Sequence, residues 1–226
     1  MSIGLIVAAG GSGSRFSTSS NKLLSHIHGL PIICHTLKKF LNIPEITHTV
    51  LVLPASEIQT FQSVIQQYRI PLPHIISGGD NRFSSVKLGL NSLPQEIQYV
   101  MVHDAARPLV SQQLIQRLIK EKEAHPAIIP AIPIIDTIKK VDPNQFVIHT
   151  VPRDEYRAIQ TPQLFKKAPL SHYYQHTSYT SQITDDAMLC ELNDLPIKVI
   201  DGETYNIKIT TPNDLPILNA LYMQVQ

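Results

Sequence analysis

Tryptophan is absent from the 226-residue sequence, and cysteine is scarce, with only two residues. Because Cys34 and Cys190 lie far apart and in no paired motif, we expect neither a disulfide framework nor a cysteine-rich zinc site. An excess of one charge is also missing, since 19 basic side chains face 18 acidic ones, which argues against a nucleic-acid-binding protein. No apolar stretch approaches the ~20 residues of a membrane-spanning helix. We therefore expect a protein of the reducing cytoplasm that binds neither nucleic acid nor membrane.

Hydrophobic residues make up 43% of the chain, which is enough to build a sizeable core. Four runs of strand length are apolar throughout, as in strands that helices cover on both faces, at residues 4–9, 48–54, 99–104 and 127–135. Segments of helical period lie between or after them, at residues 56–68, 111–125 and 210–223. The pattern predicts a Rossmann-like α/β fold, with a mostly parallel sheet and helices on both faces, in a single domain over residues 1–226.

Polar residues at the starts of the helical segments predict their N-caps. Ser56 and Gln59 have the spacing of a capping box, and Ser111 precedes the second segment. Thr211 stands before Pro212, a residue that suits the first helical position. We expect each of the three hydroxyls to accept a backbone N–H.

Residues 136–151 break the alternation of strands and helices. They read as two short strands around a turn at residues 142–144, Asp-Pro-Asn. An isolated two-stranded hairpin is only marginally stable in water. We therefore expect residues 136–153 to form an arm that packs on a second copy of the chain and makes a homodimer.

Residues 3–16, IGLIVAAGGSGSRF, join the first apolar run to a loop of small residues that ends at Arg15. Such a loop lies at the carboxyl end of its strand, where α/β proteins bind ligands. Glycines let backbone N–H groups approach an anion closely, and an arginine adds a bidentate donor. Lys22 adds a second cation a few residues later. The loop therefore predicts a phosphate-binding site, with an ordinary glycine turn as the alternative.

Two familiar phosphate loops do not fit. The dinucleotide fingerprint needs a third glycine where Phe16 stands, and residues 33–36 carry no carboxylate for a ribose. The Walker pattern needs a Gly-Lys-Ser/Thr ending, which this loop lacks. A nicotinamide oxidoreductase is therefore the weakest interpretation.

Residues 5–16 and 21–24 resemble the signature loop of nucleotidyltransferases that act on sugar or polyol phosphates. Further segments resemble the 2-C-methyl-D-erythritol 4-phosphate cytidylyltransferase family, in the order that the family shows, at residues 78–90, 102–110, 136–141, 153–165, 183–187 and 206–215. The resemblance spans nearly the whole chain. The loop differs from the family pattern at one place. Two residues, Gly11 and Ser12, separate its Ala-Ala-Gly and Gly-x-Arg parts, where the family has a single residue.

The resemblance implies transfer of CMP from CTP to 2-C-methyl-D-erythritol 4-phosphate, with release of pyrophosphate, in non-mevalonate isoprenoid precursor biosynthesis. The attacking phosphate needs no general base, because its second pKa is about 6 and it is largely dianionic at neutral pH. The difficulty is repulsion between two anions, so cations and positioning should dominate catalysis. The resemblance also implies Mg2+ as cofactor, held by Asp104 and substrate phosphates.

The resemblance assigns roles to individual residues. Catalytic roles on the phosphates fall to Arg15, Lys22, Arg153 and Lys208. Nucleotide binding falls to Ala8, Ala9, Gly10, Gly11, Gly13, Gly79, Asp80, Ser85 and Ala105. Acceptor binding falls to Asp104, Arg107, Thr137, Thr161 and Thr184. Because Thr137 and Arg153 flank the hairpin, we expect them to serve the active site of the partner chain.

Structural alternatives stay open for several of these residues. Asp80 is also placed to cap a helix that begins near residue 81. Asp104 and Arg107 also suit a plain salt bridge, and Asp185 and Asp186 suit a helix N-terminus.

Two other functions fit much of the pattern. A ribitol-5-phosphate cytidylyltransferase would share the loop, the base site and much of the scaffold. A non-catalytic nucleotide-binding protein would also share the loop. A degenerate sensor of that kind should have lost a cation, yet Arg15, Lys22, Arg153 and Lys208 are all present.

Overall fold

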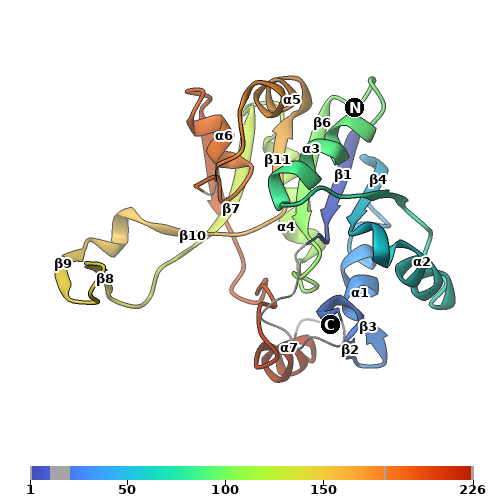
Figure 1. Cartoon of the computed structure of the whole chain (residues 1–226), viewed down its shortest axis with the longest axis horizontal. Coiled ribbons are helices and arrows are strands. Elements are labelled where there is room, and N and C mark those ends of the chain that lie inside the picture. The colour runs from blue at the N-terminus through green and yellow to red at the C-terminus, as the bar shows by residue number, and fades with distance from the viewer. Residues whose placement is uncertain (1, 11–20, 181, 225–226) are drawn as a thin grey trace.

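The computed structural model describes residues 2–10, 21–180 and 182–224, and most of their strands join one mixed sheet (Figure 1). Within these residues the sheet has eight strands in the order β10-β7-β11-β6-β1-β4-β5, with β12 paired to β7. The strands are β1 (Ile3–Ala8), β4 (Ile46–Leu53), β5 (His74–Ser77), β6 (Tyr99–Asp104), β7 (Ala127–Pro133), β10 (Arg157–Ile159), β11 (Gln163–Lys166) and β12 (Ile197–Asp201). The four apolar runs expected from the sequence correspond to β1, β4, β6 and β7.

Most strand pairs in this sheet are parallel. β1 pairs in parallel with β4 and β6, β4 with β5, and β7 with β12. β11 instead runs antiparallel to β6 and β7, and β10 runs antiparallel to β7. Between β7 and β10 the chain passes through the arm without a helical crossover, so it returns in the opposite direction. The prediction of a mostly parallel sheet is confirmed.

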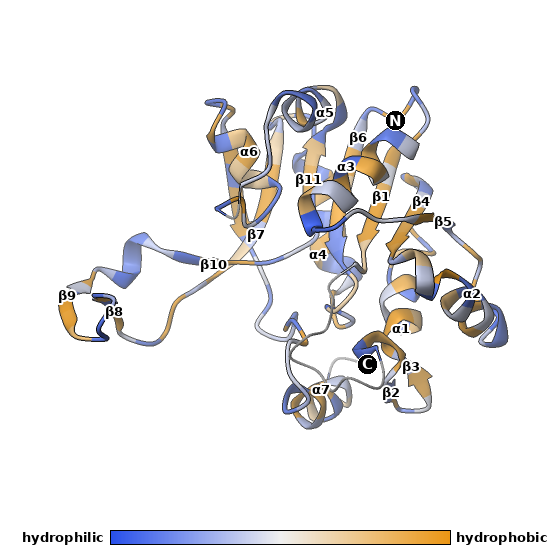
Figure 2. Ribbon diagram, viewed as in Figure 1, coloured by the Kyte–Doolittle hydropathy of each residue, from blue (hydrophilic) through white to orange (hydrophobic). Residues whose placement is uncertain are grey.

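Two hydrophobic clusters cover the two faces of the sheet, because successive side chains of a strand alternate in direction. Leu5 and Val7 join one cluster, with α1 (Ile32–Lys38), α2 (Ile58–Gln67) and α4 (Gln112–Glu121). Ile6 joins the other, with α3 (Arg82–Ser92), α5 (Lys167–His176) and α6 (Ala187–Glu191). Figure 2 shows the resulting hydrophobic centre along the strands. Helices on both faces are therefore confirmed.

The smaller elements lie near the lower end of the sheet in Figure 1. They include η1 (Lys22–Leu24), β2 (His26–Ile27), β3 (Leu30–Pro31) and the last helix, α7 (Asp214–Tyr222). Leu218 of α7 packs into the cluster of Leu5 and Val7. No helix in the described part of the chain is both long and apolar enough to cross a bilayer.

One of the three predicted N-caps is confirmed and two are wrong. Ser111 accepts the backbone N–H of Leu114 at 2.9 Å. Ser56 instead lies inside the 3-10 turn η2 (Ala55–Glu57), and α2 begins without a side-chain cap. Thr211 does not cap α7 either, because the Asp214 carboxylate accepts the N–H of Thr211 at 2.8 Å. A charged acceptor makes the stronger hydrogen bond.

The predicted hairpin is present and stands away from the sheet at the left of Figure 1. It consists of β8 (Ile138–Val141) and β9 (Val147–Val151), which pair antiparallel. The Asp142 carboxylate closes the turn by accepting the N–H of Phe146 at 2.8 Å. Phe146 is 72% exposed and Val147 is 60% exposed, so the arm carries apolar side chains that nothing in the described chain covers.

Both cysteines are buried within helices, Cys34 in α1 and Cys190 in α6. Burial raises the pKa of the Cys34 thiol to about 11 and that of Cys190 to about 12. The thiols therefore stay protonated at neutral pH and act as small packed side chains.

Candidate active site

Two pockets open at the carboxyl ends of β1 and β6, as expected for an α/β sheet. The first, here called the β1 pocket, is lined by Ala8, Ala9, Gly10, Lys22, Leu23, Arg82, Ser85, Asp104, Ala105, Ala106 and Lys208. The second, here called the β11 pocket, is lined by Arg82, Asp104, Arg107, Ile159, Gln160, Thr161, Gln163, Thr184, Asp185 and Lys208. Arg82, Asp104 and Lys208 line both, so the pockets meet at these three side chains.

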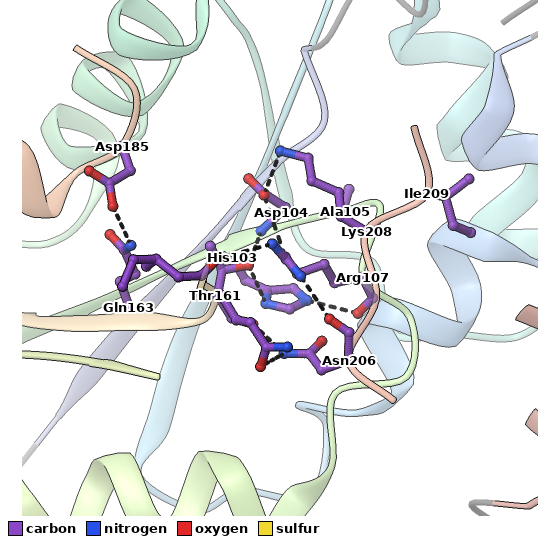
Figure 3. A network of polar contacts seen from close by, with 12 residues as sticks. His103, Asp104, Ala105, Arg107, Thr161, Gln163, Asp185, Asn206, Lys208 and Ile209 are labelled. Carbon is purple, nitrogen blue, oxygen red and sulfur yellow. Dashed lines mark hydrogen bonds and ion pairs between the residues drawn. The ribbon is translucent and has the colours of Figure 1, made fainter. Parts of the chain in front are cut away.

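Asp104, the last residue of β6, lies among three cations, Arg82, Arg107 and Lys208. Figure 3 shows Asp104 with Arg107 and Lys208. Asp104 Oδ2 is 2.8 Å from Lys208 Nζ and 3.7 Å from Arg107 Nε. Its Oδ1 is 3.4 Å from Arg82 Nε. Burial raises the pKa of Asp104, but Arg82, Lys208 and Arg107 together lower it well below its usual range. Asp104 is therefore a fixed negative charge where the pockets meet, and the alternative salt bridge to Arg107 is part of this cluster.

Lys208 belongs to a segment that the surrounding chain holds on both sides. Before it, the carbonyl of Asn206 accepts a hydrogen bond from Arg107 Nη1 at 2.7 Å. After it, the carbonyl of Ile209 accepts one from Lys22 Nζ at 2.9 Å. These bonds join three parts of the chain, so the cations expected at residues 22, 107 and 208 come together only through the tertiary fold.

His103 is fully buried and connects Thr161 to the turn after β6. Its Nε2 lies 3.1 Å from the carbonyl oxygen of Arg107, which can only accept, so Nε2 carries the proton. Burial lowers the pKa of His103 to about 4, which keeps the ring neutral at pH 7. Its Nδ1 must then accept from the Thr161 hydroxyl, 3.2 Å away, while that hydroxyl accepts the N–H of Asp104 at 3.0 Å. These hydrogen bonds fix the backbone at Asp104 and at Arg107.

Ser85 holds the glycine segment that precedes α3 against the β1 pocket. Its Oγ accepts the N–H of Gly79 at 3.2 Å. A Cβ added at Gly78 would lie 2.7 Å from the same Oγ, and one added at Gly10 would lie 3.2 Å from it, so both positions favour glycine. Asp80 is exposed beside this segment, and the alternative that it caps α3 is wrong. Asn81 takes that place instead, as it accepts the N–H of Ser84 at 2.8 Å.

Arg82 joins Asp104 to the start of α6, a contact that the sequence analysis missed. Its Nη2 donates to Asp186 Oδ2 at 2.6 Å, and Tyr174 donates to Asp186 Oδ1 at 2.5 Å. Asp186 directly precedes α6, so both aspartates lie at the helix N-terminus that was their structural alternative, although the Asp186 side chain makes no cap hydrogen bond. Asp185 does cap, because it accepts a backbone N–H of α6 at 3.1 Å. Arg82 lies within segment 78–90, which resembles the family, but no feature of the sequence distinguishes it there from a surface arginine.

Some of the expected residues lie elsewhere. Thr137 and Arg153 are exposed on the arm and line neither pocket within the described chain. Arg153 Nη1 instead donates to the carbonyl of Ile135 at the root of the arm. Gly11, Gly13 and Arg15 lie outside the described residues.

Asp104 is the one carboxylate among the described residues where the two pockets meet, and it is the residue that would hold a magnesium ion arriving with a substrate. In the parts of the chain that the structure describes, no three histidine, cysteine or acidic side chains are arranged so that they could hold a metal ion together. Mg2+ often takes one or two carboxylates and completes its shell with substrate phosphates and water. A single ionised carboxylate at the junction of two pockets fits that pattern.

Comparisons with known proteins agree with this geometry. The model of the family described as "IspD: 2-C-methyl-D-erythritol 4-phosphate cytidylyltransferase" matches residues 3–224. A protein of that name from Alkaliphilus metalliredigens is 36% identical, and the match covers 97% of this chain and 92% of that protein. The bifunctional enzyme IspD/IspF of Desulfotalea psychrophila is also 36% identical, but the chain spans only 54% of its length.

Solved structures show the same arrangement of the backbone. The crystal structure of 4-diphosphocytidyl-2C-methyl-D-erythritol synthase from Anaerococcus prevotii has a TM-score of 0.85 at 29% identity, over 99% of this chain and 96% of that one. The 2-C-methyl-D-erythritol 4-phosphate cytidylyltransferase of Thermus thermophilus has a TM-score of 0.78 at 26% identity, over 99% of this chain and 100% of that one. The chain therefore belongs to the 2-C-methyl-D-erythritol 4-phosphate cytidylyltransferase (IspD) family.

Proposed function

We propose that this protein transfers CMP from CTP to 2-C-methyl-D-erythritol 4-phosphate and releases pyrophosphate, a step of non-mevalonate isoprenoid precursor biosynthesis. The observation that carries the proposal is the junction of two pockets at Arg82, Asp104 and Lys208. A transfer between two phosphates needs two neighbouring anion sites that share a wall. Membership of the IspD family supplies the identity of the substrates.

The β1 pocket suits the nucleotide. Its lining includes Ala8, Ala9 and Gly10 after β1, and Ala105, which directly follows β6. In the proposal Gly11 and Gly13 of the loop bind the nucleotide as well. Small residues let backbone N–H groups approach phosphate oxygens. The base would lie against Gly79, Asp80 and Ser85, where a backbone carbonyl and a hydroxyl meet the donor and acceptor groups of cytosine.

The β11 pocket suits the acceptor, with Arg107, Thr161 and Thr184 in its wall. Lys208 stands between both pockets and would hold the attacking phosphate beside the α-phosphorus of CTP. The acceptor oxygen forms the new P–O bond, and the bond to pyrophosphate breaks on the opposite side. Since two anions must approach each other, Lys22, Lys208 and Arg15 act by neutralising charge in the transition state.

Asp104 would hold Mg2+ together with phosphate oxygens of the substrates. When bound, the ion neutralises phosphate charge and polarises the phosphoryl group. Asp104 itself stays ionised, because neighbouring cations keep its pKa low. Its carboxylate is therefore charged at every pH near neutrality, and a magnesium ion would compete there with Lys208, Arg82 and Arg107.

We further propose that the arm at residues 136–153 forms a homodimer. Its exposed apolar residues need a partner, because a lone hairpin in water is marginal. Thr137 and Arg153 are exposed on the arm and outside the chain's own pockets, so they would complete the β11 pocket of the partner chain. We also propose that residues 1–226 act as one domain and that the protein is cytoplasmic, which agrees with two unpaired, buried thiols.

Pyrophosphate release tests this function directly. The purified protein would be incubated with CTP, Mg2+ and either 2-C-methyl-D-erythritol 4-phosphate or ribitol 5-phosphate, and the product identified by mass spectrometry. We expect turnover with the first acceptor and none with the second, and none when UTP or ATP replaces CTP. Turnover with ribitol 5-phosphate alone would assign the protein to the other cytidylyltransferase class. Binding of CTP without turnover would identify a nucleotide-binding protein.

A further inference from the structure

Arg82, the first residue of α3, is a cation at the junction of the pockets that the family resemblance left without a role. It lines both pockets, together with Asp104 and Lys208. Its side chain is 29% exposed, so part of the guanidinium faces the open space of the site. A positive charge in this position lies where the two pockets of the proposed reaction meet.

The hydrogen bonds of Arg82 leave one edge of its guanidinium available. Nη2 donates to Asp186 at 2.6 Å, and Nε lies 3.4 Å from Asp104 Oδ1. Nη1 has no hydrogen-bond partner among residues 2–10, 21–180 and 182–224. Because a guanidinium carries five N–H donors in a fixed plane, the bonds behind it set the direction of the edge that remains.

Asp186 and Tyr174 fix the position of Arg82 on the side away from the pockets. The Asp186 side chain is fully buried, and its two oxygens accept from Arg82 and from the Tyr174 hydroxyl. Burial lowers the pKa of Arg82, but Asp186 and Asp104 raise it by more, so the side chain stays charged. Among the described residues, four cations line the two pockets, Lys22, Arg82, Arg107 and Lys208. They face the carboxylates of Asp104 and Asp185 in the lining and of Asp186 behind it, which leaves a net positive charge for anionic substrates.

We propose that Arg82 is a further substrate-binding cation of this reaction, with its Nη1 edge on the phosphate oxygens where the two substrates meet. Asp186 and Tyr174 are positioning residues that aim it. The inference rests on the proposed function, since it needs phosphates in both pockets. The rival explanation is that Arg82 only neutralises the buried charge of Asp186.

An Arg82→Lys variant separates these two explanations. A lysine keeps a positive charge beside Asp186 but loses the planar fork and its outward edge. We expect kcat to fall by about 10²-fold with an unchanged melting temperature, as for loss of one transition-state donor. A kcat and KM within threefold of wild type would overturn the proposal.

A double variant, Arg82→Met with Asp186→Asn, removes the buried charge pair as a whole. If Arg82 only neutralises Asp186, the double variant should match Asp186→Asn alone both in kcat and in stability. We expect stability to recover while kcat stays about 10²-fold below wild type. Arg117→Met is the matched control, because Arg117 is exposed and lines neither pocket, and it should leave kcat and KM unchanged.

Tyr174→Phe tests the positioning from behind, since its hydroxyl touches Asp186 but no pocket. We expect a fall in kcat of roughly threefold to tenfold that disappears in the Arg82→Lys background, because coupled residues are not additive. Equal effects in both backgrounds would remove Tyr174 from the proposal.

Affinity for the reaction product, 4-diphosphocytidyl-2-C-methyl-D-erythritol, gives a readout that does not depend on turnover. Its linked phosphates would occupy the junction of both pockets. Calorimetry with this compound should show binding about tenfold weaker in Arg82→Lys than in wild type. Unchanged affinity would overturn the role of Arg82, whereas wild-type protein without any pyrophosphate release would refute the proposed function instead.

Discussion

Replacing Lys208 with methionine separates the electrostatic role of this side chain from its contribution to stability. Lys208 Nζ lies 2.8 Å from Asp104 Oδ2, and the lysine side chain is 41% exposed. Without it, Asp104 keeps Arg82 at 3.4 Å and Arg107 at 3.7 Å, so no buried charge is left unpaired. Methionine also retains an apolar stem. We therefore expect the free energy of unfolding to fall by only about 1 kcal/mol.

The effect of the same change on turnover should be much larger. In the proposed reaction the cations at the junction would offset the repulsion between two substrate phosphates. Lys208 lines both pockets and lies nearest to Asp104. Loss of one preorganised donor to a transition state costs about 3–4 kcal/mol, or roughly 10²–10³ in kcat. The transition state should thus lose about three times as much stabilisation as the folded state.

Two measurements check this difference. Steady-state pyrophosphate release gives kcat and KM for CTP and for the acceptor, and urea denaturation gives the free energy of unfolding. Lys198→Met is the matched control, because Lys198 is an exposed residue of β12 that lines neither pocket. A Lys208→Met enzyme with kcat within threefold of wild type would refute the role of Lys208. A loss of several kcal/mol in unfolding free energy would show that the reasoning about Asp104 is wrong.

Three further predictions follow from the same structure. Lys22→Ala should lower kcat by roughly 10²–10³ without unfolding the protein, and near-normal turnover would remove Lys22 from the mechanism. His103 has its folded-state pKa lowered from 6.5 to about 4, so the unfolded state binds more protons and stability should decline as the pH falls from about 6.5 to about 4. That loss is about 3 kcal/mol, and it should be missing from the pH profile of His103→Gln in urea titrations. Mixing inactive Arg153→Ala and Lys208→Ala chains should restore about a quarter of wild-type activity, because half of the dimers then hold one intact site. No recovery after verified subunit exchange would place Arg153 in the site of its own chain.

Local patterns in the sequence were sufficient for much of the fold. The four apolar runs became strands because they can be covered on both faces, and alternation of apolar side chains decided which cluster each residue joined. The Asp142 turn and its hairpin were also readable, since an Asp-Pro-Asn sequence closes a turn by short-range hydrogen bonds. The N-cap at Thr211 failed because the Asp214 carboxylate, within the same turn, accepts the backbone N–H of Thr211. The N-cap at Ser56 failed because the chain enters α2 through the 3-10 turn η2, which contains Ser56.

The sequence predicted those pocket-lining residues that belong to short motifs. The segment 8–10, Lys22 and Ser85 do line one pocket, and Asp104, Arg107 and Thr184 line the other. Arg82 was missed because an arginine at the start of a helix has no distinctive pattern. Its importance depends on Asp186, which lies more than a hundred positions later in the chain.

The amino-acid sequence by itself determined the α/β class, the hairpin and the family, because each rests on short segments whose order and spacing can be read along the chain. Only the tertiary structure decided which charges share a site. Asp104, Arg82 and Lys208 come from β6, α3 and the segment before α7, and their separation is set by how the sheet and helices pack. Electrostatic energy depends on the distance between charges and on their burial, and neither can be derived from the order of the residues alone.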